Sequence, residues 1–314
     1  MYKRQEYAKA LNFRADVIHA NDWHTAMLPL YLHSNYKFDE FWKGTKCVFE
    51  IHNLAYQGIW FQDVLDFANM RKDIVYNQWG CEHYDRVNWM KGAIQYADRV
   101  VAVSPTYAKE ILTPEYGENM DYTLRGVQYK LRGILNGIDY TVFNPKKDKA
   151  LAKNYDVKSL DKKEENKKAV CKFFGIKYNP DRPLIALISR LVDQKGIDLI
   201  RDMQYELQKL DADFIFMGSG DNSYENLFIW LSNNTPNIRT FVGYDAKLAN
   251  LIYAGSDFFL MPSKFEPCGL SQLIAMRYGS LPIVRATGGL EDTVTGYPPV
   301  SYTHLRAHET SAHL

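Results

Sequence analysis

The chain is 314 residues long, which is enough for about two domains. Hydrophobic residues make up 46% of it and charged residues 24%, as is typical of a soluble globular protein, and no apolar run predicts a transmembrane helix. The net charge of +1 excludes a general attraction to nucleic acid or to a membrane surface, so an anionic ligand must be met by local charges.

Short apolar segments alternate with amphipathic helical patterns along the chain. This alternation predicts an α/β fold whose parallel sheets are covered by helices on both faces. The strands expected in chain order are Val17–Ala20, Cys47–Ile51, Val100–Val103, Gly133–Leu135, Leu184–Ile188, Phe214–Met217, Thr240–Val242, Phe258–Leu260 and Leu281–Val284.

The strand signals are interrupted once, over residues 145–182. This interval contains a charged, helix-prone run, Asp156–Lys172, and is expected to be a linker with a helix. We therefore predict a first domain over residues 1–144 and a second over 183–300, with a ligand site at the carboxyl ends of the strands.

Residues 301–314 and the cysteines carry no chemistry that we can assign. The final segment holds His304, His308 and His313 without a packing pattern, so we expect a non-native tail. A metal-binding histidine tail is the alternative, although the spacing fits no standard site. The four scattered cysteines indicate reduced thiols, and the missing apolar signal region favours a cytoplasmic setting.

Polar and aromatic side chains follow the first two expected strands. Asp22 and His24 are suited to holding hydroxyl groups, and Trp23 is suited to stacking on a sugar. A metal is the competing interpretation, but a third ligand is not evident. His52 follows the next strand, where a lone histidine is more often structural. Two polar clusters at successive strand ends favour the wall of a binding site. Asn136, before Gly137, is equally well explained as a turn residue.

Two cations follow the first strand of the second expected domain. Arg190 and Lys195 lie five residues apart across a turn, so they can converge on a diphosphate, although a solvated loop has the same pattern. The Gly218-Ser219-Gly220 turn after the next strand is a weak signal of close backbone approach. Tyr244 is expected to begin a helical segment, where it either stacks on a base or caps the core.

The most informative segment is the turn that contains Glu266. A buried strand leads into Pro267 and Gly269, and Leu270–Tyr278 is expected to be a helix. The N-terminus of a helix offers unpaired N–H groups and a partial positive charge that suit a phosphate, and the nearby carboxylate is suited to a sugar hydroxyl. Such a phosphate cradle beside an acid is what a nucleotide-sugar site requires.

Taken together, these segments resemble the bacterial glycogen synthase and plant starch synthase family, which elongates α-1,4-glucans. The blocks that carry the resemblance run in family order from about residue 15 to residue 294: HANDWHTAMLPLYL, IHNLAYQG, NWMKGAIQYADRVVAVSPTYAKEI, GILNGID, ISRLVDQKG, YAGSDFFLMPSKFEPCGLSQLIAMRYG and VRATGGLEDTV. The resemblance implies two facing Rossmann-like domains of the GT-B type. It also implies an acceptor-side first domain, a nucleotide-sugar-binding second domain, and a plastid location in a plant.

The resemblance also implies roles for individual residues. Catalytic or donor contacts are implied for Glu266 on the donor glucose, for Arg190 and Lys195 on the diphosphate, and for His52 near the glucose 6-hydroxyl. The remaining implied contacts are Asp22 and Asn136 near the donor glucose, Tyr244 near adenine, Trp23 on the acceptor side, and the turn of Cys268, Gly269, Leu270 and Ser271 at the phosphate.

The implied reaction moves glucose from ADP-glucose to the non-reducing end of an α-1,4-glucan with retention, and needs no metal or cofactor. The family's lysine-glycine-glycine loop and its closing segment are not found in this sequence. Both domains are therefore expected to be truncated, and the chain alone is expected to have little activity. Ile274 occupies the position of the second glutamate in related transferases, so no carboxylate pair is expected. The alternatives are a glycosyltransferase with another donor and a non-catalytic glucan- or nucleotide-binding module.

Overall fold

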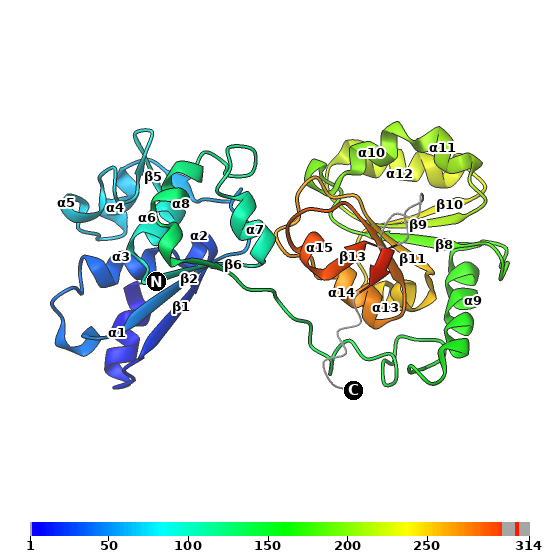
Figure 1. Ribbon diagram of the computed structural model, residues 1–314, viewed down its shortest axis with the longest axis horizontal. Helices are drawn as coiled ribbons and strands as arrows, with labels where there is room; N and C mark the ends of the chain where they lie inside the picture. Colours follow the sequence, from blue (N-terminus) through cyan, green and yellow to red (C-terminus); the bar gives the residue numbers. More distant parts are fainter. Residues whose placement is uncertain (1, 297–304, 308–314) are drawn as a thin grey trace. The chain divides into compact units, whose positions relative to one another are not determined.

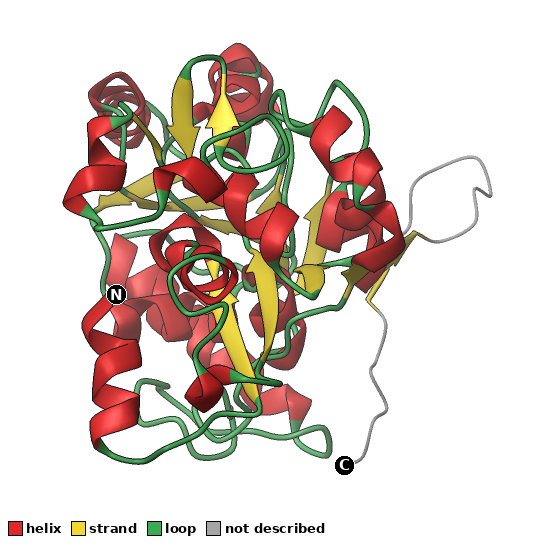
Figure 2. Cartoon of the chain, turned by 90° about the vertical axis from the view of Figure 1, so that its left-hand side faces the viewer, coloured by secondary structure: helices red, strands yellow, loops and turns green. Residues whose placement is uncertain are grey.

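The computed structural model describes residues 2–296 and 305–307, and the chain divides into two compact units, Met1–Leu135 and Asn136–Leu314. Figure 1 follows the chain by colour through both units, and Figure 2 shows strands flanked by helices. None of the helices in the described ranges is both long and apolar enough to cross a membrane.

The first unit contains a four-stranded parallel sheet in the order β1-β2-β6-β7. Its strands are β1 (Val17–Asn21), β2 (Lys46–Ile51), β6 (Arg99–Ala102) and β7 (Leu131–Gly133). Phe49 and Ile51 on β2 are fully buried, as their alternation with less buried residues predicts. The helices are α1 (Tyr2–Ala10), α2 (Asp22–Thr25), α3 (Met27–His33), α4 (Asp63–Phe67), α5 (Lys72–Val75), α6 (Trp89–Tyr96), α7 (Pro105–Glu110) and α8 (Asp121–Gly126).

Strand β7 is displaced from the expected Gly133–Leu135. The chain leaves the sheet after Gly133, where a Cβ atom would lie 2.4 Å from the Cα of Pro105, and Ile134 is 59% exposed. The predicted bounds of β7 were wrong because Ile134 and Leu135 are apolar but lie outside the sheet. A small antiparallel sheet was also missed because its strands are only two or three residues long: β3 (Ile59–Trp60), β4 (Glu82–His83) and β5 (Arg86–Asn88).

The second unit contains a five-stranded parallel sheet in the order β10-β9-β8-β11-β12. Its strands are β8 (Leu184–Ile188), β9 (Asp213–Gly218), β10 (Ile238–Val242), β11 (Phe258–Met261) and β12 (Leu281–Val284). All neighbouring strands are parallel, and the bounds of β8 and β12 equal the predicted ones.

Helices cover both faces of this sheet, as Figure 1 shows. On one face, Phe214 and Phe216 of β9 pack with Phe228 of α12. On the other, Ile215 and Met217 pack with residues of α13 and α14. The near-continuous apolar strands therefore reflect burial on both faces. The helices are α9 (Lys163–Phe174), α10 (Ile197–Asp202), α11 (Gln204–Lys209), α12 (Asn222–Asn234), α13 (Ala246–Gly255), α14 (Ser271–Arg277) and α15 (Gly288–Thr293).

The interval 145–182 belongs to the second unit and packs onto the rest of it through α9. Gly255 at the end of α13 approaches α9 so closely that a Cβ atom would lie 2.6 Å from Val170 Cγ2. The Lys163 ammonium donates a 2.6 Å hydrogen bond to the carbonyl of Ala254, and the Tyr155 hydroxyl donates a 2.7 Å bond to the carbonyl of Tyr278.

Part of the expected tail forms a strand. β13 (Val294–Gly296) pairs antiparallel with β14 (Leu305–Ala307), a pairing that the sequence pattern did not predict. The other residues of 301–314, including the three histidines, lie outside the described residues.

Candidate functional site

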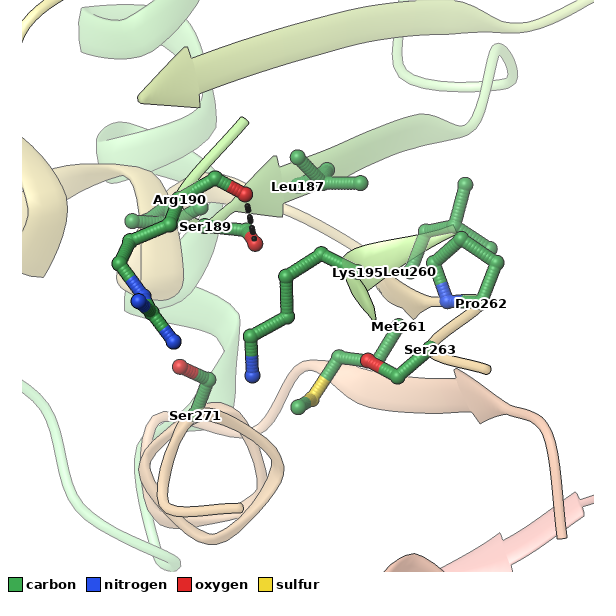
Figure 3. Close-up of a pocket in the computed structure, with 10 residues that line it drawn as sticks. Leu187, Ser189, Arg190, Lys195, Leu260, Met261, Pro262, Ser263 and Ser271 are labelled. Carbon is green, nitrogen blue, oxygen red and sulfur yellow. Dashed lines mark hydrogen bonds between the residues drawn. The ribbon is translucent and has the colours of Figure 1, made fainter. Parts of the chain in front are cut away.

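The candidate site lies in the second unit, where the order of its strands reverses. From β8 the chain adds β9 and β10 on one side, then returns to add β11 and β12 on the other. Ligands of open α/β sheets bind at such switch points, beyond the carboxyl ends of the strands. A pocket of about 230 Å³ opens there between β8 and β11, lined by Leu187, Ile188, Ser189, Arg190, Lys195, Leu260, Met261, Pro262, Ser263 and Ser271 (Figure 3).

Two loops form this pocket, and we call them the Arg190 loop (residues 189–196) and the Glu266 turn (residues 262–270). Gly196 has a φ of +70°, and a Cβ atom there would lie 2.0 Å from the carbonyl oxygen of Pro262. The amide of Lys264 donates a 2.9 Å hydrogen bond to the carbonyl of Gln194. Only glycine permits this approach, which joins the two loops side by side.

Lys195 and Glu266 meet across the two loops. The Lys195 Nζ atom lies 2.5 Å from Glu266 Oε2, and the same oxygen accepts a 3.0 Å hydrogen bond from Ser263 Oγ. The side chains of Lys195 and Glu266 are 16% and 8% exposed. Glu266 is thus a buried carboxylate whose charge is balanced by a cation and a hydroxyl, as burial requires.

Arg190 extends into the same space. In Figure 3 the nitrogen ends of Arg190 and Lys195 point toward one region of the pocket, with the Ser271 hydroxyl beside it. Ser189 Oγ donates a 2.9 Å hydrogen bond to the carbonyl of Arg190, which holds the backbone of the loop. The predicted pair of cations is therefore brought together at one pocket, with a geometry that suits a diphosphate.

The Glu266 turn leads directly into α14, one residue later than the expected start. Its N-cap is Leu270, whose apolar side chain cannot accept a hydrogen bond from the first-turn amides. Gly269 has a φ of +70°. The amides at the start of this helix are therefore not capped by the N-cap side chain, as the predicted phosphate cradle requires.

Gln272 and the Thr287–Gly289 segment support the Glu266 turn, and the sequence motifs did not predict a role for either. Gln272 Nε2 donates to the carbonyls of Cys268 and Gly269 at 3.0 and 2.9 Å. A Cβ atom on Gly289 would lie 2.1 Å from the carbonyl oxygen of Cys268, and the Gly289 amide donates to the carbonyl of Glu266 at 3.0 Å. The two adjacent glycines of the VRATGGLEDTV block were the available signal.

The weaker predictions in this unit have structural explanations. A Cβ atom on Gly218 would lie 1.9 Å from the carbonyl oxygen of Ser189, so this glycine allows the Arg190 loop to pack on β9. Tyr244 is 72% exposed and lies before α13 rather than beginning it, because Asp245 is the N-cap and accepts from the Leu248 amide at 2.7 Å. Asn136 is the first residue of the second unit.

A second polar cluster lies in the first unit, where β1 and β2 end. Asp22 has a φ of +52°, and its Oδ1 accepts a 2.9 Å hydrogen bond from the His52 amide. His52 Nε2 lies 2.9 Å from Asn21 Oδ1, and Glu50 lies between His52 and His19, 2.7 Å from His19 Nε2. The two polar clusters that were predicted at successive strand ends are therefore in direct contact through Asp22 and the backbone of His52.

Trp23 follows Asp22 on α2 and packs against His24, with ring centroids 4.1 Å apart and the ring planes tilted by 31°. Gly58 lies against its indole, since a Cβ atom there would be 2.5 Å from Trp23 Cε3. No group of three or more histidine, cysteine, aspartate or glutamate residues with metal-binding geometry occurs in the described ranges.

Two family models match the chain, one in each unit. Residues 4–126 match the starch synthase catalytic domain, and residues 182–301 match the glycosyl transferases group 1. Glycogen synthase of Clostridioides difficile is 46% identical over 97% of the chain, and that of Thermosipho melanesiensis is 45% identical over 93%. The chain belongs to the glycogen and starch synthase family of glycosyltransferases. It spans 65% and 61% of the length of these two relatives.

Solved structures agree with this family. The catalytic domain of starch synthase IV from Arabidopsis thaliana, bound to ADP and acarbose, has a TM-score of 0.88 and 37% identity and covers 95% of this chain and 62% of that one. Sucrose-phosphate synthase from Thermosynechococcus elongatus shares the fold, with a TM-score of 0.56 at 18% identity over 93% of this chain and 60% of that one. The predicted GT-B type α/β fold is confirmed.

Proposed function

We propose that the second unit binds the ADP-glucose donor of a retaining transferase that adds glucose to the non-reducing end of an α-1,4-glucan. The observation that carries the proposal is the convergence of Arg190 and Lys195 on one pocket at the switch point of the sheet, where Lys195 is also paired with Glu266. The ADP and acarbose bound by the Arabidopsis relative support this choice of a nucleotide donor and a glucan acceptor.

In this proposal, the cations and amides of the pocket assist the departure of ADP. Cleavage of the glucose–phosphate bond builds negative charge on the diphosphate. Arg190, Lys195 and the amides of the segment Cys268–Ser271 stabilise that charge without a metal. One well-placed donor of this kind contributes about 3 kcal/mol, or about 100- to 1000-fold in rate.

Glu266 holds hydroxyls of the donor glucose and is not a general base. One of its oxygens is already bonded to Lys195 and Ser263, which fixes the orientation of the carboxylate. We propose that Tyr244 contacts the adenine. We also propose that His52 and Asp22 of the first unit contact the donor glucose, as does Asn136 of the second unit, and that Trp23 stacks on the acceptor. We further propose a cytoplasmic setting, or a plastid in a plant. This is supported by the four cysteines, which are all thiols rather than disulfides, as a reducing compartment favours.

The test is calorimetric binding of ADP and ADP-glucose, with ADP release measured in the presence of glycogen. Lys195→Ala should weaken binding of both ligands, and Glu266→Ala should weaken ADP-glucose more than ADP. Lys264→Ala is the matched control, because Lys264 neighbours the pocket but pairs with Asp198 at 2.8 Å. If neither Lys195→Ala nor Glu266→Ala changes binding, the assignment is refuted. Tighter binding of UDP-glucose than of ADP-glucose would favour a related glycosyltransferase that uses another donor. Glucan binding without ADP release by any form of the enzyme would favour a non-catalytic module.

A further inference from the structure

The carboxylate of Glu266 is held asymmetrically. Lys195 and Ser263 both bind Oε2, and among the described residues no group donates a hydrogen bond to Oε1. Glu266 is 6% exposed and Ser263 only 1%, so the rotation of this carboxylate is fixed by those two partners inside the protein. Oε1 is then the oxygen left to accept hydrogen bonds from a ligand.

We infer that Ser263 is a positioning residue, which holds Glu266 Oε2 so that Oε1 faces the donor sugar. This inference rests on the proposed function of the pocket. A diphosphate in the pocket competes with Glu266 for the Lys195 ammonium, since both are anions within reach of one cation. The Ser263 hydroxyl is neutral and has no such competitor, so it remains the partner of the buried carboxylate when Lys195 turns to phosphate.

Ser263 is itself fixed by the fold. It follows β11 by two residues, and the neighbouring Pro262 is locked against Gly196 of the Arg190 loop. The hydroxyl is therefore presented to Glu266 from a rigid strand end, three residues before it in the chain. This arrangement orients a sugar-binding carboxylate without exposing it to water.

The test compares binding of ADP-glucose and ADP to the full chain by calorimetry. Loss of a hydrogen bond to a charged group should make Ser263→Ala bind ADP-glucose about tenfold more weakly. Binding of ADP, which has no glucose for Glu266 to hold, should change less than about twofold. Ser263→Thr keeps the hydroxyl and should restore most of the affinity. In steady-state assays the change should appear in KM for ADP-glucose.

Ser256→Ala is the matched control, because Ser256 is a fully buried serine near the opposite end of β11 whose hydroxyl pairs with Ser280 at 2.9 Å. Ser256→Ala should lower the free energy of unfolding, but it should not change the affinity for ADP-glucose relative to that for ADP. When Glu266→Ala is already present, adding Ser263→Ala should not weaken ADP-glucose binding any further.

Equal loss of ADP and ADP-glucose binding, or an undiminished effect of Ser263→Ala in the Glu266→Ala background, would overturn the role of Ser263 alone. Failure of the unaltered chain to bind either nucleotide would instead refute the proposed function, and the inference with it.

Discussion

Gly196 lies against the carbonyl group of Pro262, so close that a Cβ atom on residue 196 would be 2.0 Å from the oxygen. This contact joins the loop that carries Lys195 to the turn that carries Glu266. Two segments far apart in the sequence thereby become one pocket.

Gly196→Ala should destabilise the second unit and weaken ADP binding. The variant combines a φ of +70° with a backbone clash, and left-handed strain alone costs about 1–3 kcal/mol. Gly175→Ala is the control, because Gly175 has a φ of +67° but open space where the Cβ atom would lie. Urea unfolding should show the larger loss for Gly196→Ala, and only that variant should reduce ADP binding. Equal losses in the two variants would show that the clash with Pro262 has no consequence.

Arg190→Lys should weaken ADP binding by about tenfold although the charge is kept, because lysine cannot replace the planar guanidinium at a diphosphate. The unfolding free energy should change little, since Arg190 is exposed. Calorimetry with ADP and with adenosine would measure this effect. An equal loss of adenosine affinity would contradict a contact to phosphate.

Gln272→Ala should lower the unfolding free energy by about 2–3 kcal/mol, because the buried carbonyl of Cys268 and the partly buried carbonyl of Gly269 lose a donor and a cavity forms. Gln208→Ala offers a comparison, since the Nε2 atom of Gln208 is buried without a partner among the described residues. Denaturant titration should show a larger loss of unfolding free energy for Gln272→Ala than for Gln208→Ala. A smaller effect for Gln272→Ala than for Gln208→Ala would argue against its support of the Glu266 turn.

Lys163 should make stability depend on pH. Burial lowers the pKa of its ammonium from the ordinary 10.5 to about 7. Between these values the unfolded chain binds more protons than the folded chain at this site, so the unfolding free energy rises with pH over that window. Below pH 7 both states are charged, and the full cost of burying the charge is present.

Lys163→Met should remove this rise. The stability of the unaltered protein relative to the variant should therefore increase from about pH 7 to pH 10, as measured by urea midpoints at each pH. Lys168→Met, on the exposed side of the same helix, should give a nearly constant difference. A constant difference for Lys163→Met as well would contradict the lowered pKa.

Much of the fold could be predicted because burial on both faces makes the strands continuous apolar runs. The limits of β8 and β12 followed directly from their apolar residues. Strand β7 was misplaced because Ile134 and Leu135 are apolar yet leave the sheet. The strand Leu305–Ala307 was missed because three residues carry no periodicity, and only its pairing with Val294–Gly296 defines it.

The candidate residues of the site were evident in the sequence, but the contacts between them were not. A carboxylate in a turn before a helix, and two cations after a strand, are local patterns that the sequence displays. No role was predicted for Ser263 or Gln272, because serine and glutamine next to a turn form no distinctive sequence motif. Their roles depend on which atom each side chain reaches once the chain is packed.

By itself, the sequence determined the α/β class, most strand positions and the family, and it indicated candidate residues for binding an anion. Tertiary structure alone decided that Lys195 and Glu266 are partners, although they are 71 residues apart. The physical reason is the reversal of strand order, which makes β8 and β11 neighbours and brings their carboxyl ends to one edge of the sheet. Hydrophobic periodicity defines strands one at a time, but their lateral order follows from packing of the whole unit.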